Sequence, residues 1–102
     1  MAIGPGFLEP IYRRAMEVAL EHRGIAFRRQ MDVHVYFEGV DLGVHRLDLV
    51  VEEQVILELK AVKGFEDIHF AQIRSYLKAT GLHTGLLLNF NAPTLVTKRV
   101  VL

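Results

Sequence analysis

The chain has 102 residues, 51% of them hydrophobic, and its 12 basic and 12 acidic side chains give a formal net charge of zero. This length suits one domain, residues 1–102, and the balanced charge excludes a global positive field for capturing nucleic acid. The absence of cysteine excludes disulfides and thiolate metal sites. No apolar run approaches the roughly 20 residues of a membrane span, and no signal peptide is visible. We therefore expect a cytoplasmic protein without a membrane partner.

The first half of the sequence predicts one helix followed by strands. Apolar residues recur at helical spacing over residues 7–23, where Pro10 is tolerable in the first turn and Gly24 is a good stop. Alternating polarity and short apolar runs then predict three strands. These strands are expected over residues 26–37, 44–51 and 55–62, separated by a turn at 38–43 and a loop at 52–54.

The second half predicts another helix and one or two strands. The helix is expected over residues 67–80, with Asp67 as its N-cap and Gly81 as its stop. The apolar run at 84–90 predicts a buried strand, and residues 98–102 predict a last edge strand. The order α-β-β-β-α-β indicates an α/β protein with a mixed sheet flanked by two helices, because a helical crossover separates the third and fourth strands.

Charged residues interrupt the two apolar strands in the middle of the chain. With a three-residue loop at 52–54, Asp48 faces Glu58 across the hairpin and Arg46 faces Lys60. Like charges placed directly opposite each other cost about 0.2–1 kcal/mol in a sheet, so stability alone does not explain them. A two-residue turn would shift the register by one and send the two acids to opposite faces.

Two converging carboxylates are a candidate metal site. Asp48 and Glu58 supply the hard oxygen ligands that Mg²⁺ requires. Lys60, two residues along the same face, is able to orient a water or stabilise charge on a phosphate. The alternative is a solvated strand face with a cross-strand charge pair. The apolar neighbours of Glu58 favour a central strand, where a charge is costly without a partner or a metal.

These residues resemble the signature of the PD-(D/E)xK nuclease superfamily. That signature is an acid on the second core strand, here Asp48, followed by acid-x-Lys on the third, here Glu58-Leu59-Lys60. Leu47 stands where the superfamily usually has proline. The resemblance implies a restriction-endonuclease-like core, whose order of helices and strands is the one predicted above.

Two further motifs narrow the resemblance. The N-terminal stretch is similar to the opening of the GxxExxY group, with Gly6, Glu9 and Tyr12 carrying the name. Gln72 and Tyr76 resemble the Gln-x-x-x-Tyr motif of the exonuclease-like branch. Members of the GxxExxY group typically carry a further helical segment before this point, so a short natural form and a trimmed form both stay open.

The resemblance implies a role for each acid and for the lysine. Glu9, Asp48 and Glu58 would hold Mg²⁺ or Mn²⁺, with the Leu59 carbonyl as an extra ligand, and Lys60 would position the attacking water. For Glu9 the alternative is a favourable interaction with the helix dipole. For Lys60 it is a salt bridge that neutralises one of the acids.

The remaining candidates lie on the second helix. Gln72 and Tyr76 are four residues apart and share a helical face, so they are able to support the site or touch substrate phosphate. The alternative is a half-buried amphipathic face. Four scattered histidines without ligand spacing are interpreted as surface residues: His22, His34, His45 and His83.

The function that follows is metal-dependent hydrolysis of a phosphodiester bond in DNA. A second hypothesis is a catalytically silent binding module for nucleic acid or protein, and a third is a structural domain whose acids are salt-bridged. A homodimer is an additional expectation, because so small a domain offers little surface for gripping a duplex.

Overall fold

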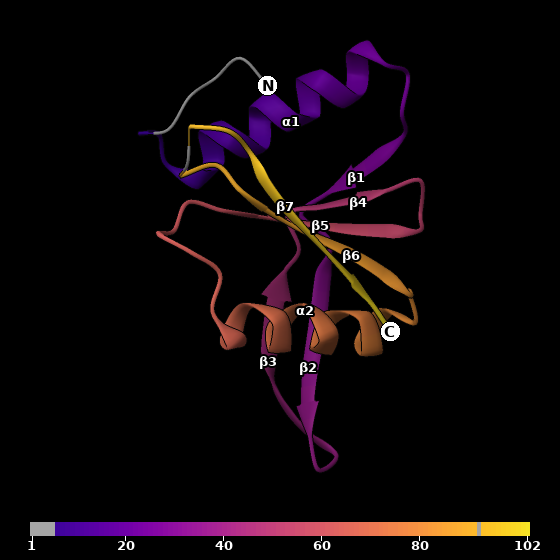
Figure 1. Cartoon of the computed structure of the whole chain (residues 1–102). Helices are drawn as coiled ribbons and strands as arrows, with labels where there is room; N and C mark the ends of the chain where they lie inside the picture. The colour runs from indigo at the N-terminus through magenta and orange to yellow at the C-terminus, as the bar shows by residue number, and fades with distance from the viewer. Residues whose placement is uncertain (1–5, 92) are drawn as a thin grey trace.

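The computed structural model describes residues 6–91 and 93–102, which form two helices and seven strands (Figure 1). None of the helices in this part of the chain is long and apolar enough to cross a membrane. The elements, in chain order, are α1 (Glu9–His22), β1 (Phe27–Arg29), β2 (Asp32–Phe37), β3 (Val40–Arg46), β4 (Leu49–Val51), β5 (Val55–Lys60), α2 (Asp67–Thr80), β6 (Thr84–Asn89) and β7 (Val96–Val101).

Five of the strands form one mixed sheet in the order β1-β4-β5-β6-β7. Only β5 and β6 are parallel, because α2 connects them as a crossover; the other neighbours are antiparallel. Helix α1 covers one face of the sheet and α2 the other (Figure 1). The predicted mixed sheet flanked by two helices is therefore confirmed.

The strands β2 and β3 form a separate hairpin that packs against α2 and projects beyond it (Figure 1). The predicted strand over residues 26–37 is wrong in this respect, because it divides into β1 and β2. The division falls at Gln30, which has a positive φ of 55° and cannot continue an extended strand. Likewise, the strand predicted over residues 44–51 divides at Leu47-Asp48, where the chain passes from the hairpin into the main sheet.

The hairpin turn is also tighter than the sequence indicates. It occupies Glu38 and Gly39, and the chain is already extended at Val40, so the predicted turn over residues 38–43 is too long. The strands lose register between Val35 and Tyr36, which is a β-bulge on β3. Gly43 has a φ of 132° at this bulge, a conformation that side chains disfavour.

Alternation along the strands builds two apolar layers, one on each face of the sheet. On the α1 face the buried cluster includes Tyr12, Leu57 and Leu59. On the α2 face it includes Ile56 and Ile73. Since Ile56 belongs to the α2-side cluster, the even-numbered positions of β5 face α2.

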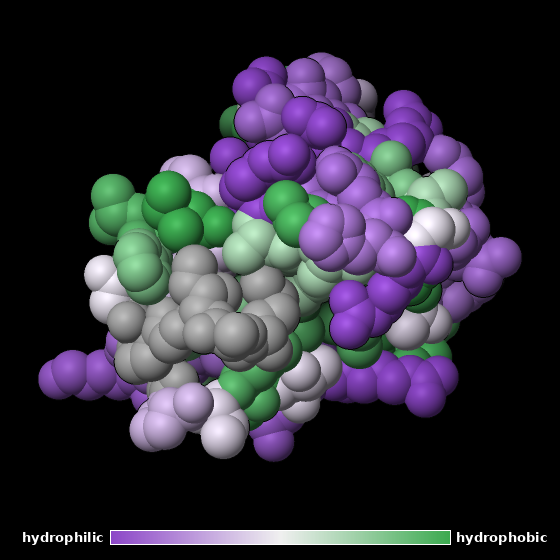
Figure 2. Space-filling model, turned by 90° about the horizontal axis from the view of Figure 1, so that it is seen from above, coloured by the Kyte–Doolittle hydropathy of each residue, from purple (hydrophilic) through white to green (hydrophobic). Residues whose placement is uncertain are grey.

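Figure 2 looks onto the α1 side and shows hydrophilic side chains over much of that face, with an apolar patch at one edge.

The helix ends follow the expected chemistry with one correction. Gly81 ends α2 in the left-handed conformation, with a φ of 77°, as predicted. The N-cap of α2 is Glu66 and not Asp67, because the Glu66 backbone N–H donates a 2.9 Å hydrogen bond to His69 Nδ1. The last strand begins at Val96, two residues before the predicted start.

We predict that Gly85→Ala destabilises the fold by about 1–3 kcal/mol, the usual cost of overpacking a core. A Cβ at this position of β6 would lie 2.5 Å from Ile73 Cδ1, and Ile73 is fully buried under α2. The measurement is urea unfolding. Gly64→Ala is the control, because a Cβ there meets nothing within 4 Å.

The same substitution should cost less in an Ile73→Val background, which removes the clashing Cδ1. Equal destabilisation by Gly85→Ala in both backgrounds would contradict this account of how α2 packs on the sheet.

Candidate active site

Of the two acids of the predicted site, Asp48 immediately precedes β4 and Glu58 lies within β5. Leu49 pairs with Leu57 and Val51 with Val55, so the three-residue loop and its register are confirmed. Continued by one residue, this register brings Asp48 opposite Glu58. Glu52 and Glu53 close the loop with positive φ values of 54° and 58°. The alternative register, with the acids on opposite faces, does not form.

Glu58 is a buried carboxylate on the central strand. Only 3% of the residue is exposed. Its Oε1 lies 3.5 Å from His45 Nε2, and both atoms are buried without a hydrogen-bond partner in the described part of the chain. Burial raises the pKa of the Glu58 carboxyl, His45 opposes this shift, and the charge of Asp48 adds to it. Glu58 is therefore a high-energy anion in the absence of a cation.

Asp48 differs from Glu58 because its oxygens have partners. Asp48 Oδ2 accepts a 2.8 Å hydrogen bond from the Leu59 N–H, and Oδ1 lies 3.4 Å from Arg13 Nη1 on α1. Arg13 was not among the predicted site residues, and its 35-residue separation from Asp48 hides the pair from any local pattern. Arg13 and the backbone thus stabilise the charge of Asp48, whereas the buried Oε1 of Glu58 has no hydrogen-bond partner in the described residues.

His45 belongs to the site, so its interpretation as a surface residue is wrong. Its ring stacks on Tyr76 of α2, with centroids 4.2 Å apart and planes 5° from parallel. Burial, followed by the charges of Glu58 and Asp48, raises the pKa of the Tyr76 hydroxyl to about 12. Tyr76 is therefore neutral at physiological pH, and its ring packs against His45 beside the candidate site.

Lys60 ends β5 two residues after Glu58 and on the same face of the sheet. It is half-buried, and no acid in residues 6–91 or 93–102 forms an ion pair with it. The salt bridge considered from the sequence is absent there, since Asp48 pairs with Arg13 instead. The ammonium group of Lys60 is thus available to a bound molecule.

Glu9 and Gln72 lie nearer the margins of the site. Glu9 is exposed in the first turn of α1 and lines a surface pocket with Ala61, the residue that follows Lys60, and with Asn91. Within the described residues, no three His, Asp or Glu side chains gather closely enough to hold one metal ion. Glu9 as a third ligand stays a prediction. Gln72 is half-buried one turn before Tyr76, and its role also stays a prediction.

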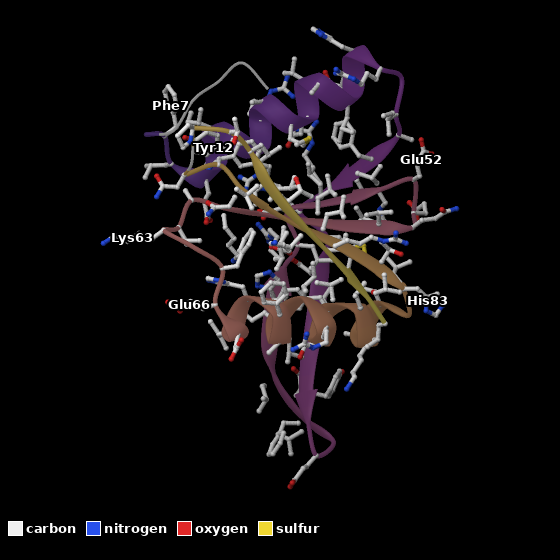
Figure 3. All side chains as sticks on the ribbon, viewed as in Figure 1. Phe7, Tyr12, Glu52, Lys63, Glu66 and His83 are labelled. Carbon is white, nitrogen blue, oxygen red and sulfur yellow. The ribbon has the colours of Figure 1, made fainter. Side chains whose placement is uncertain are left out.

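Tyr12 of the same N-terminal motif has a structural role. It is fully buried, stacks on Phe90 with ring centroids 4.6 Å apart, and its hydroxyl oxygen accepts a 3.0 Å hydrogen bond from the Phe7 N–H. Figure 3 shows Phe7 and Tyr12 side by side at the start of α1. Tyr12 therefore fixes the segment that carries Glu9 against the sheet.

The family model of the PD-(D/E)XK nuclease superfamily matches residues 1–100, so the chain belongs to that superfamily. No curated protein matches the chain.

Two solved structures share the fold. One is the crystal structure of SSO0001, with a TM-score of 0.69, 14% identity, and coverage of 90% of this chain and 48% of that one. The other is the alkaline exonuclease LHK-Exo from Laribacter hongkongensis, with a TM-score of 0.64, 12% identity, and coverage of 90% and 55%. The chain therefore spans about half the length of these two proteins, and the likeness shows the fold alone.

Nucleases of this superfamily generally use divalent metal ions, and the residues present fit one. Two carboxylates converge from β4 and β5, and the buried Oε1 of Glu58 has no partner in the described residues. Carboxylate oxygens are the ligands that Mg²⁺ prefers in proteins. A cation would also remove the like-charge repulsion between Asp48 and Glu58.

We predict that Glu58→Gln stabilises the metal-free protein at pH 7.5 by about 1–3 kcal/mol, the cost of a buried polar group without a partner. The raised pKa means that the folded chain keeps the Glu58 proton to a higher pH than the unfolded chain does. Wild-type stability is therefore lost as pH rises from the ordinary value of 4.5 through the folded pKa, and the advantage of the variant should vanish below that window.

The measurement is urea unfolding in chelator at pH 7.5 and again at a pH below the ordinary value of 4.5. Glu53→Gln is the matched control, because Glu53 is largely exposed and lies on the loop of the same hairpin. A Glu58→Gln variant less stable than wild type at pH 7.5 would show that Glu58 has a stabilising partner and would contradict this prediction.

Proposed function

We propose that the protein is a metal-dependent nuclease that hydrolyses phosphodiester bonds in DNA. The observation that carries the proposal is the arrangement of three side chains. Asp48 and Glu58 face each other at the end of the β4–β5 hairpin, and Lys60, which forms no ion pair with the described residues, follows on the same face. A structural domain with salt-bridged acids would account for the pairing of Asp48 with Arg13, but not for the buried Oε1 of Glu58, which has no hydrogen-bond partner among the described residues.

Asp48, Glu58 and the Leu59 carbonyl would hold Mg²⁺ or Mn²⁺, and Glu9 of α1 would be a third carboxylate ligand. When bound, the ion supplies charge stabilisation on the phosphate and a lowered pKa for a coordinated water. The hydrogen bond from the Leu59 N–H fixes the Asp48 carboxylate before any ligand arrives. Arg13 restrains the same group from the α1 side.

Lys60 would donate a hydrogen bond to the attacking water and orient it toward the phosphorus. Its ammonium has three donors and no acceptor, so it favours the developing hydroxide over the water. Gln72 would contact the substrate phosphate or support the site from α2. The ring of Tyr76 stacks on the imidazole of His45. The neutral Tyr76 hydroxyl adds no negative charge to repel a phosphate.

Finer assignments belong to the same proposal. Gly6, Glu9 and Tyr12 favour the GxxExxY group of the superfamily, and the burial of Tyr12 gives that motif a physical reason. We infer one domain over residues 1–102, a cytoplasmic location and a homodimer that enlarges the surface for a duplex. A nucleic-acid substrate is favoured because the chain belongs to a nuclease superfamily and LHK-Exo, which shares the fold, is an alkaline exonuclease; DNA is our proposal within that class.

A second candidate is a binding module that keeps the fold without turnover. The observation that bears on its partner is the pairing of several arginines within the chain, which favours a protein over a nucleic acid. Arg14 pairs with Glu17 and Arg29 lies 3.8 Å from the same carboxylate, so these cations are not free to grip a phosphate backbone. Metal-dependent strand cleavage separates the two candidates.

We predict that Glu58→Ala and Lys60→Ala fail in different ways. Loss of Glu58 should weaken Mn²⁺ binding and cleavage together. Loss of Lys60 should leave Mn²⁺ affinity unchanged or slightly raised, because a nearby positive charge is removed, while cleavage falls by about 10²–10⁴-fold. The measurements are calorimetric Mn²⁺ titration and single-turnover cleavage of single- and double-stranded DNA and RNA.

Lys63→Ala is the matched control, because Lys63 is exposed in the loop just after β5 and points away from the molecule (Figure 3). Cleavage by Lys60→Ala at the wild-type rate would overturn the proposed mechanism. Mn²⁺ binding without cleavage of any substrate would favour the binding module.

A further inference from the structure

We infer that His45 is a positioning residue that fixes the carboxylate of Glu58, an inference that rests on the proposed function of Glu58 as a metal ligand. The acid-x-Lys motif does not include His45, which lies on β3 in the separate hairpin. Its buried Nε2 nevertheless faces Oε1 of Glu58, and neither atom has a hydrogen-bond partner among the described residues.

The geometry indicates a weak donor–acceptor pair. Nε2 of His45 and Oε1 of Glu58 are 3.5 Å apart, too far for a hydrogen bond of ordinary strength but with no other described partner for either atom. Only an imidazole with a proton on Nε2 presents a donor to this carboxylate. A hydrogen bond closed between these two atoms would limit the rotamers that Glu58 can adopt.

The imidazole is itself held from two directions. Tyr76 stacks against the ring face at 4.2 Å, which fixes the ring plane. Along β3, His45 alternates with the exposed Val44 and Arg46, so its side chain turns inward. Just before it, the β-bulge at Gly43 is closed by a 2.9 Å hydrogen bond from the Gly43 N–H to Asp41 Oδ1. Bulges of this kind re-aim the side chains that follow them.

Positioning of a metal-binding carboxylate by a neighbouring hydrogen-bond donor has a known scale. Loss of such a partner typically costs 10–100-fold in metal affinity. His45 would contribute through Glu58 alone, without touching the substrate. In this arrangement Tyr76 would act by supporting the imidazole of His45 with its ring, and not by contacting phosphate.

The test compares His45→Gln, which keeps an amide donor near the position of Nε2, with His45→Leu, which removes it. Calorimetric Mn²⁺ titration should show an affinity loss of about 10–100-fold for His45→Leu and recovery of most of that loss in His45→Gln. His34→Leu is the matched control, since His34 lies exposed on the neighbouring strand and pairs with Asp41. It should bind Mn²⁺ as wild type does.

A metal-free readout separates this inference from the proposed function. In crystal structures of the apo protein, Glu58 should take one rotamer in wild type and His45→Gln, and several in His45→Leu. If wild type binds no Mn²⁺ yet this pattern holds, the proposed metal site fails and the positioning role stands. If His45→Leu keeps one Glu58 rotamer, or binds Mn²⁺ as tightly as wild type, the positioning role is overturned.

Should His45→Leu not fold, His45→Gln alone decides. Wild-type affinity with the wild-type Glu58 rotamer supports the role. A different rotamer, or an affinity as low as that of Glu58→Ala, shows that a donor at this position is not sufficient and overturns it.

Discussion

A carboxylate buried on the middle strand of an apolar sheet is the constraint on which the rest of the site depends. Glu58 lies on β5, between β4 and β6, and only 3% of it is exposed. Removing a charge from water is costly unless it is paired, hydrogen-bonded or bound to a metal. Burial and the charge of Asp48 raise the pKa of the Glu58 carboxyl, and the nearby His45 opposes that shift without cancelling it.

A four-residue segment brings both of these neighbours to Glu58. His45 ends up on the hairpin side and Asp48 at the start of β4, because the chain crosses between the two sheets at Leu47. The Leu47 N–H donates a 2.8 Å hydrogen bond to the Met31 carbonyl, and the buried Leu47 side chain anchors the crossing in the α2-side core. One short stretch therefore sets both the acid opposite Glu58 and the imidazole beside it.

Sequence patterns predicted what depends on local periodicity. Both helices, the three-residue loop and the opposition of Asp48 to Glu58 follow from spacing and are found in the structure. The division of the long predicted strands does not follow from spacing, because a positive φ at Gln30 does not change the alternation of polar and apolar residues. His45 was missed for a related reason: its inward direction depends on the hairpin packing under α2. His45 and the apolar Leu47 are two residues apart, so an extended chain places their side chains on the same face. This spacing is the sequence signal that indicates an inward-facing His45.

A crystal of the protein soaked in Mn²⁺ shows whether Asp48 and Glu58 form one cation site. If they do, an anomalous peak lies between the two carboxylates, with an oxygen of each within about 2.0–2.6 Å of the metal ion. An anomalous peak at another place, with both carboxylates in their metal-free positions, would contradict a shared cation site. The absence of any peak at saturating Mn²⁺ would contradict it too.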